Sequence, residues 1–410
     1  MSPDRKMNGR DVAVLDSSEF VTTPDHQVAV VQIPVNKGPI SGIATSHDGS
    51  RLVVTNYGGD SVSIVDVDDC RVVGTIADVD EPFAIAMGEA GTDRAYVSTV
   101  SAAYDAIQVI DLATNSIVAT HPVALSVSDL SASADGKYIY ASRNGVRAAD
   151  VAVLDSATGR VEVVDIATTP GTTTECVRVS PDGGRLYVGV NGPAGGQLVV
   201  IDTGMVPEAG AESEGRSRWR RKSPKSPAKS KANAAQQDAT RNAAPKLTVI
   251  ETIEIGLAVR DVAISPTGTL VYVASSGPDF AVLDVVDTRT NKITSTRKIG
   301  EVNGLLTRLT LSGDGDRAYL VSHDSVTMLC TLTQDVIDSV NVATQPSCVV
   351  ESRDGKYLYI ADYSGAITVA PIAAGSESGF EQAALESKRS ADLFVPDLLQ
   401  HDLQYDPALV

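Results

Sequence analysis

Short apolar runs separated by polar, glycine-rich turns follow one another along most of the chain. The stretch 39–76 contains four such runs, at residues 43–46, 52–55, 62–65 and 72–76. Each is rich in β-branched residues and too short for an ordinary helix, so it predicts a strand. Asp48-Gly49 and Gly58-Gly59-Asp60 separate the first three runs, and glycine tolerates the positive φ that tight hairpins require. The stretch predicts a four-stranded antiparallel meander, which has to stack on copies of itself to bury both faces.

The same arrangement repeats along the chain. The turn between the first and second strands recurs at Asp48-Gly49, Gly91-Thr92-Asp93, Asp135-Gly136, Asp182-Gly183, Thr267-Gly268, Asp314-Gly315 and Asp354-Gly355. A second strand such as LVVTN, YIYAS or LYIAD follows each of these turns. Apart from one long insertion, the spacing of about forty to forty-seven residues is typical of β-propeller blades. The sequence therefore predicts an all-β fold, a seven-bladed β-propeller of four-stranded antiparallel blades.

These repeats resemble the YVTN-repeat β-propeller family, named for the second-strand motif that stands here as Val53-Val54-Thr55-Asn56. The consensus D-G-x-[KR]-x-Y-V, followed by V-x-V-[IV]-D-x-x-[TN], is matched best in the repeats that start near Pro39, Pro82, Ser128 and Glu175. The resemblance covers about residues 27–373 apart from the insertion. It implies the fold, but the wider group includes sugar-lactone hydrolases, cofactor-bearing redox domains and plain binding modules, so it implies no single function.

The two ends of the repeat predict how the ring closes. Residues 27–35 form a fourth strand with no partners assigned directly before it, and the last repeat lacks a fourth strand. Placing the N-terminal strand on the outer edge of the last blade removes an exposed edge. Residues 11–16 and 366–370 compete for the third position of that blade, and we favour the later run, because the short turn Ser364-Gly365 joins it to the second strand. The expected units are an N-terminal arm (1–26), the propeller (27–373) and an acidic tail (374–410).

A long insertion, residues 204–246, separates the third and fourth strands of the fourth repeat. It is rich in Ser, Ala, Lys and Arg and lacks apolar periodicity, which predicts a disordered loop. Residues 216–231 hold eight positive charges, no negative charge and the single Trp: Arg216, Arg218, Trp219, Arg220, Arg221, Lys222, Lys225, Lys229 and Lys231. This run predicts binding to nucleic acid, another polyanion or a partner, with Trp219 able to stack. The alternative is a solvated low-complexity insertion.

Composition and charge restrict the remaining function classes. The 410 residues carry a net charge of −18, which opposes general binding of the ring itself to nucleic acid or anionic membrane. No apolar run suits a signal peptide or a membrane span, so we expect a cytoplasmic protein. The four cysteines lie in different repeats, without spacing that would indicate a disulfide framework or a zinc site. Because a closed ring leaves no free sheet edge, we expect a monomer.

Charged residues gather near the start of the first, innermost strands in repeats three to six. The funnel candidates, including a histidine in a loop expected on the same face, are Asp129, Glu175, Arg260, Asp261, Arg308 and His323. Convergent charges in a concave funnel predict a small-ligand site. The alternative is that these side chains pair with each other and hold neighbouring blades in register. No catalytic Ser-His-Asp set, haem motif or metal-ligand pattern accompanies them, so we expect no catalytic residues, no cofactor and no metal.

These features favour a non-enzymatic propeller that acts as a protein-interaction or ligand-binding scaffold. One alternative is a lactonase-like hydrolase that acts on a sugar lactone in the funnel, with Glu175, Arg260 and Arg308 as its polar groups. The other alternative is polyanion binding through the basic run 216–231.

Overall fold

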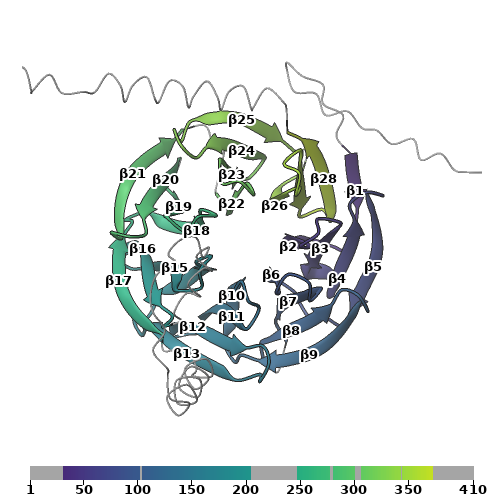
Figure 1. Cartoon of the computed structure of the whole chain (residues 1–410), viewed down its shortest axis with the longest axis horizontal. Helices are drawn as coiled ribbons and strands as arrows, with labels where there is room; N and C mark the ends of the chain where they lie inside the picture. The colour runs from purple at the N-terminus through teal and green to yellow at the C-terminus, as the bar shows by residue number, and fades with distance from the viewer. Residues whose placement is uncertain are drawn as a thin grey trace, which may run out of the picture.

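The structure, a computed structural model, describes residues 31–101, 104–204, 247–277, 280–300, 306–342 and 344–372. Within these ranges the chain forms seven four-stranded antiparallel sheets, which stand as blades around one axis in Figure 1. In the first six blades the strands follow in chain order, with the first strand nearest the axis and the fourth at the rim (Figure 1). The predicted seven-bladed propeller is confirmed.

The strand bounds follow the repeats that the sequence predicts. Blades 1 and 2 contain β2 (Ile40–Thr45), β3 (Arg51–Asn56), β4 (Ser61–Asp66), β5 (Arg71–Ala77), β6 (Ile85–Met87), β7 (Arg94–Thr99), β8 (Ala106–Asp111) and β9 (Ser116–Pro122). Blades 3 and 4 contain β10 (Ser126–Ala132), β11 (Tyr138–Asn144), β12 (Ala149–Asp155), β13 (Val161–Ala167), β14 (Thr173–Val179), β15 (Arg185–Gly192), β16 (Gly195–Asp202) and β17 (Thr248–Glu254). Blades 5 and 6 contain β18 (Ala258–Ile264), β19 (Leu270–Ser276), β20 (Ala281–Asp287), β21 (Lys292–Ile299), β22 (Arg308–Leu311), β23 (Arg317–Val321), β24 (Ser325–Cys330) and β25 (Val336–Asn341).

The seventh blade joins the two ends of the chain. It contains β26 (Pro346–Glu351), β27 (Tyr357–Asp362), β28 (Ala366–Pro371) and, on its outer edge, β1 (Val31–Pro34). Strand β1 pairs antiparallel with β28, so that Ile33 lies opposite Ile367. The predicted closure by an N-terminal strand is confirmed, and 366–371 occupies the third position of the blade. Residues 1–30, which include the competing run 11–16, lie outside the described residues.

The hydrophobic core lies between blades. Seven clusters of buried residues each join the facing sides of two neighbouring blades. The cluster between blades 7 and 1, for example, packs Ile33 and Ile367 against Ile40 and Leu52, all nearly inaccessible to solvent. Each blade therefore depends on both of its neighbours for the burial of its apolar faces.

The turns between first and second strands share one set of hydrogen bonds. In blade 1 the Ser46 hydroxyl donates to Asp48 over 2.6 Å, and Asp48 also accepts the backbone N–H of Ser50. Equivalent serine-to-aspartate bonds are Ser133–Asp135, Ser180–Asp182, Ser312–Asp314 and Ser352–Asp354. The glycine after the aspartate has a positive φ in each of these turns, +77° for Gly49, as the sequence predicts.

The turn between the second and third strands of blade 1 differs from expectation. Residues Tyr57–Gly59 form a short 3-10 helix, η1, and the positive φ belongs to Asp60 rather than to the glycines. Gly59 is needed for space, because a Cβ there would lie 1.9 Å from the carbonyl oxygen of Lys37.

No helix within the described ranges is long and apolar enough to cross a membrane.

The closing strand supplies a first test. Ile33 is 1% exposed, whereas Val31 of the same strand is 49% exposed. We expect Ile33→Ala to lower the free energy of unfolding by about 2 to 4 kcal/mol through the cavity it leaves, and Val31→Ala to change it by less than about 0.5 kcal/mol. Urea unfolding followed by circular dichroism measures both, and equal effects would contradict a packed closure of the ring.

The serine–aspartate turns predict an acid limit to stability. Hydrogen bonds from Ser46 and Ser50 lower the pKa of Asp48 from 3.8 to about 2, and those from Ser352 and Lys356 lower the pKa of Asp354 to about 2. Because each folded pKa lies below the unfolded one, the stabilisation is complete above pH 4 and disappears as the pH falls towards 2.

We therefore expect the double variant Asp48→Asn, Asp354→Asn to lose stability at pH 7 and to show a shallower loss than the parent between pH 4 and 2. Thermal unfolding across this pH range measures the effect, with Asp80→Asn in an exposed loop as the charge control. An unchanged slope in the double variant would rule out these turns as the source of acid sensitivity.

Candidate ligand site in the central channel

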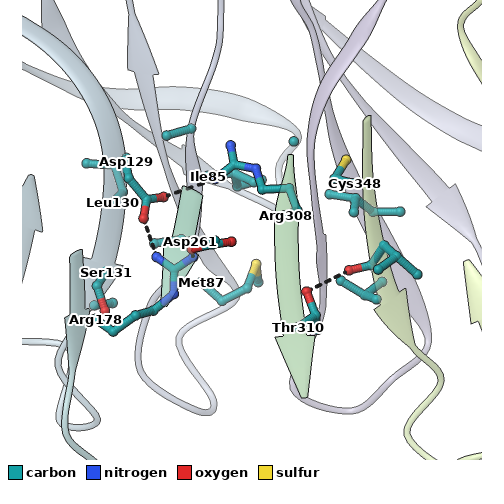
Figure 2. Close-up of a pocket in the computed structure, with 17 residues that line it drawn as sticks. Ile85, Met87, Asp129, Leu130, Ser131, Arg178, Asp261, Arg308, Thr310 and Cys348 are labelled. Atoms are coloured by element: carbon teal, nitrogen blue, oxygen red, sulfur yellow. Dashed lines mark hydrogen bonds and ion pairs between the residues drawn. The ribbon is translucent and has the colours of Figure 1, made fainter. Parts of the chain in front are cut away.

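The innermost strands enclose a cavity of about 260 Å³ on the axis of the ring. Its lining includes charged side chains from blades 3 to 6 and apolar residues from blades 7, 1 and 2. Figure 2 shows the charged group: Asp129 of β10, Arg178 of β14, Asp261 of β18 and Arg308 of β22. Four consecutive blades thus each contribute one ionisable side chain to the same space.

A bulge near the start of the innermost strands decides which residues face the cavity. The pairing of β2, β10, β14, β18 and β26 with their second strands shifts by one residue. The extra residues are Ser41, Ser128, Glu175, Arg260 and Ser347. None of them lines the cavity, whereas the next residue does so in four of the five strands. The extra residue of a bulge interrupts the alternation of side chains between the two faces of the sheet. At Ser128 the hydroxyl donates instead to the backbone carbonyl of Thr174 in the next blade, over 2.7 Å.

Arg178 holds two buried aspartates from the blades on either side of it. Its guanidinium forms ion pairs with Asp129 and, over 2.8 Å, with Asp261. The aspartate side chains are 7% and 1% exposed. Burial alone would lower the pKa of Arg178, but the negative charges of Asp129 and Asp261 outweigh this effect and raise it. Arg178 therefore stays charged and balances one of the two negative charges beside it.

Backbone N–H groups complete the surroundings of the two aspartates. Asp129 accepts the N–H of Val177 over 3.1 Å. Asp261 accepts the N–H groups of Val262 and Leu309 over 2.8 and 3.0 Å. Each aspartate therefore receives an N–H from the following blade, 48 positions along the chain. These contacts link blades 3 to 6 to one another.

Arg308 is bound more loosely than Arg178. Its side chain is 20% exposed, and its nearest carboxylate oxygen, on Asp129, lies 3.9 Å away. Within the described part of the chain Arg308 donates no hydrogen bond of ordinary length, and its guanidinium carbon lies 6.0 Å from the centre of the Phe83 ring. Burial alone would lower the pKa of Arg308, but Asp129 and Asp261 raise it, so a charged group with unused donors faces the cavity.

Of the six funnel candidates, Asp129, Asp261 and Arg308 line the cavity. Glu175 and Arg260 are half-buried bulge residues outside the lining; Glu175 accepts the hydroxyl of Thr173 over 2.7 Å, and Arg260 donates to Ser276 over 2.8 Å. His323 is exposed in the turn between β23 and β24. The structure therefore brings together three of the six.

The sequence hypotheses omit Arg178, although it holds the charged group together. It lies two residues beyond Cys176, which stands directly after the bulge of β14 as Asp129 and Asp261 do in their strands. Because side chains of a strand alternate with a period of two, residues two positions further along the innermost strands also reach the axis. Ser131 and Thr310 line the cavity for the same reason, so a second step of the count would have found Arg178.

The remaining reactive groups of the described residues include the cysteines. Cys348 lines the cavity, but burial raises the pKa of its thiol to about 11, so it stays protonated at neutral pH. All four cysteines are free. In the ranges that the structure describes, no three His, Cys, Asp or Glu side chains are grouped as metal ligands. The basic run from Arg216 to Lys231 lies outside the described residues, and its role stays a prediction.

The comparison with known proteins fits this geometry. The chain is 58% identical over 409 residues to the seven-bladed beta-propeller protein Rv1057 of Mycobacterium tuberculosis, an alignment that covers 98% of this chain and 99% of the relative. The chain belongs to the Rv1057-like family of seven-bladed β-propeller proteins. A seven-bladed beta-propeller protein of Mycolicibacterium smegmatis is 33% identical over 170 residues, which are 42% of this chain and 45% of that relative.

Outside the Rv1057-like family the likeness concerns the fold alone. Hydrazine synthase of Kuenenia stuttgartiensis superimposes with a TM-score of 0.64, over 82% of this chain and 96% of that chain, at 20% sequence identity. No protein-family model matches the chain. The resemblance to YVTN-repeat and lactonase-like propellers therefore stays a prediction.

The charged group predicts a strong dependence on its central arginine. Arg178→Met leaves two buried aspartates without their shared cation, and we expect a loss of about 3 kcal/mol in the free energy of unfolding. Adding Asp129→Asn to this variant removes one unpaired charge and should restore part of the loss. Chemical denaturation of both variants, with Arg147→Met on the exposed surface as control, checks this; a loss no greater than that of the control would show that the ion pairs contribute little.

Proposed function

We propose that this protein is a non-enzymatic binding protein that holds a small anionic ligand in its central channel. The observation that carries the proposal is the state of Arg308, a mostly buried cation whose nearest carboxylate oxygen is 3.9 Å away. A guanidinium has five N–H donors in a planar fork that suits carboxylate or phosphate oxygens. A ligand oxygen would satisfy donors that the described residues leave unused.

The other three charges of the site support this assignment. Asp129 and Asp261 are both paired with Arg178 and both accept backbone N–H groups. Arg178 thus balances one of these two negative charges and reduces the repulsion that an anion at Arg308 would meet. The cavity of about 260 Å³ has room for a small molecule only.

The hydrolase alternative has less support. It relies on Glu175, Arg260 and Arg308, of which Arg308 alone lines the cavity. The carboxylates that do line it, Asp129 and Asp261, are engaged by Arg178 and by backbone N–H groups. A carboxylate that serves as general base has to be free to take up the proton within reach of the substrate, and neither aspartate meets this condition.

Polyanion binding through residues 216–231 is a separate candidate that rests on their eight positive charges. The described neighbours of the insertion, Asp202 at the end of β16 and Thr248 at the start of β17, pair with each other. Both residues lie on one face of the ring, and the innermost strands begin on the opposite face.

The proposal predicts anion binding that depends on Arg308. We expect acetate, butyrate or phosphate to bind the full chain, and Arg308→Gln to weaken the affinity at least about tenfold, because a charged hydrogen bond is lost. Isothermal titration calorimetry measures this, with Arg147→Gln as an exposed control of equal charge change. Equal affinities of the two variants would refute the site, and turnover of a sugar lactone that Arg308→Gln abolishes would refute the non-enzymatic assignment.

A further inference from the structure

The wall of the cavity changes character around the channel. The side formed by blades 3 to 6 holds the four charged residues together with Ser131, Thr310 and the apolar Leu130 and Ala132. The opposite side, which we call the apolar wall, comes from blades 7, 1 and 2 and consists of Gly42, Ile43, Ala84, Ile85, Ala86, Met87, Cys348, Val349 and Val350. A ligand held by Arg308 therefore has polar groups on one side and hydrocarbon on the other.

The apolar wall is not completely packed. Ile85, Met87 and Val350 are half-buried, although they belong to innermost strands. Ile85 and Met87 lie on β6 of blade 2 and pack partly against the cluster between blades 1 and 2, whereas Val350 lies on β26 of blade 7 and packs partly against the cluster between blades 7 and 1. Apolar surface that remains accessible inside a channel gains free energy when a ligand covers it.

The charge of the cavity limits the charge of the ligand. Two arginines and two aspartates line it, so the four side chains carry no net charge when all are ionised. Arg178 is committed to both aspartates, which leaves Arg308 as the cation available to an anion. One guanidinium matches one carboxylate; a second carboxylate would lie against the apolar wall or near Asp129 and Asp261, where desolvation and repulsion disfavour it.

We propose that the ligand of the channel is a small aliphatic monocarboxylate, with its carboxylate on Arg308 and its hydrocarbon chain against Ile85, Met87 and Val350. This inference rests on the proposed anion site and adds the chemical class of the ligand. The carboxylate provides the orientation through a two-pronged hydrogen bond, and the hydrocarbon provides affinity through burial.

The experiment measures the affinity of the full chain for carboxylates of increasing chain length, and for a monocarboxylate and a dicarboxylate of equal length, by isothermal titration calorimetry. Along the series acetate, butyrate and hexanoate we expect a gain of up to about fourfold per added methylene until the cavity is filled. Butyrate and succinate each have four carbon atoms, and we expect butyrate to bind at least about tenfold more tightly, because succinate brings a second charge.

Variants of the apolar wall test whether the increase in affinity along the series comes from contact with this wall. Met87→Gln keeps the length of the side chain and should reduce the advantage of hexanoate over acetate, whereas Met87→Leu should preserve it. If Met87→Gln fails to fold, the comparison of butyrate with succinate on the parent protein still decides the question.

The outcomes together distinguish the monocarboxylate proposal from the anion-site proposal. A rising affinity along the series, lost on Arg308→Gln, supports both. Binding that needs Arg308 but is flat along the series, or is as tight for succinate or phosphate as for butyrate, overturns the monocarboxylate and leaves the anion site standing. Failure of every anion to bind overturns both.

Discussion

Burial between blades is the constraint on which the rest of this structure depends. Each blade has two apolar faces and each of the seven hydrophobic clusters joins two blades. A blade without both neighbours would expose one of its faces to water. The closing strand β1 follows from the same requirement, since it completes the sheet that packs against both blade 6 and blade 1. The channel is the space that seven such blades leave on their common axis.

The sequence predicts the scaffold well because the scaffold repeats. The Asp-Gly turns, the short β-branched strands and the missing strand of the last repeat each have one local physical meaning, and they agree on a closed ring of seven blades. The sequence predicts less where several residues of one turn could adopt the positive φ that the turn needs. Gly58-Gly59-Asp60 predicts a turn, but only packing against Lys37 shows that Gly59 is required for space while Asp60 takes the left-handed conformation.

The site is predicted only in part, for a reason that lies in strand geometry. Counting back from each turn gives a set of seven positions, of which Gly42, Ala84, Asp129, Asp261, Arg308 and Cys348 line the cavity. The position before them in the chain is where five strands bulge, so Glu175 and Arg260 leave the channel. A bulge adds one residue without any sequence signal of its own, and no count along a single strand detects it. Arg178, in contrast, obeys simple alternation.

A functional side chain in this ring can be recognised where it differs from the side chains at equivalent positions of the other blades. The positions equivalent to Asp129, Asp261 and Arg308 are occupied in the other blades by Gly42, Ala84 and Cys348. Those blades form the same four-stranded sheets. The fold therefore does not require a charge there. Within the charged group, the ion pairs of Arg178 with Asp129 and Asp261 tie blades together, so structure alone accounts for these three residues. Arg308 is left over from that account: its burial disfavours it, its pairing is weak, and a ligand would supply the contact that the described residues do not.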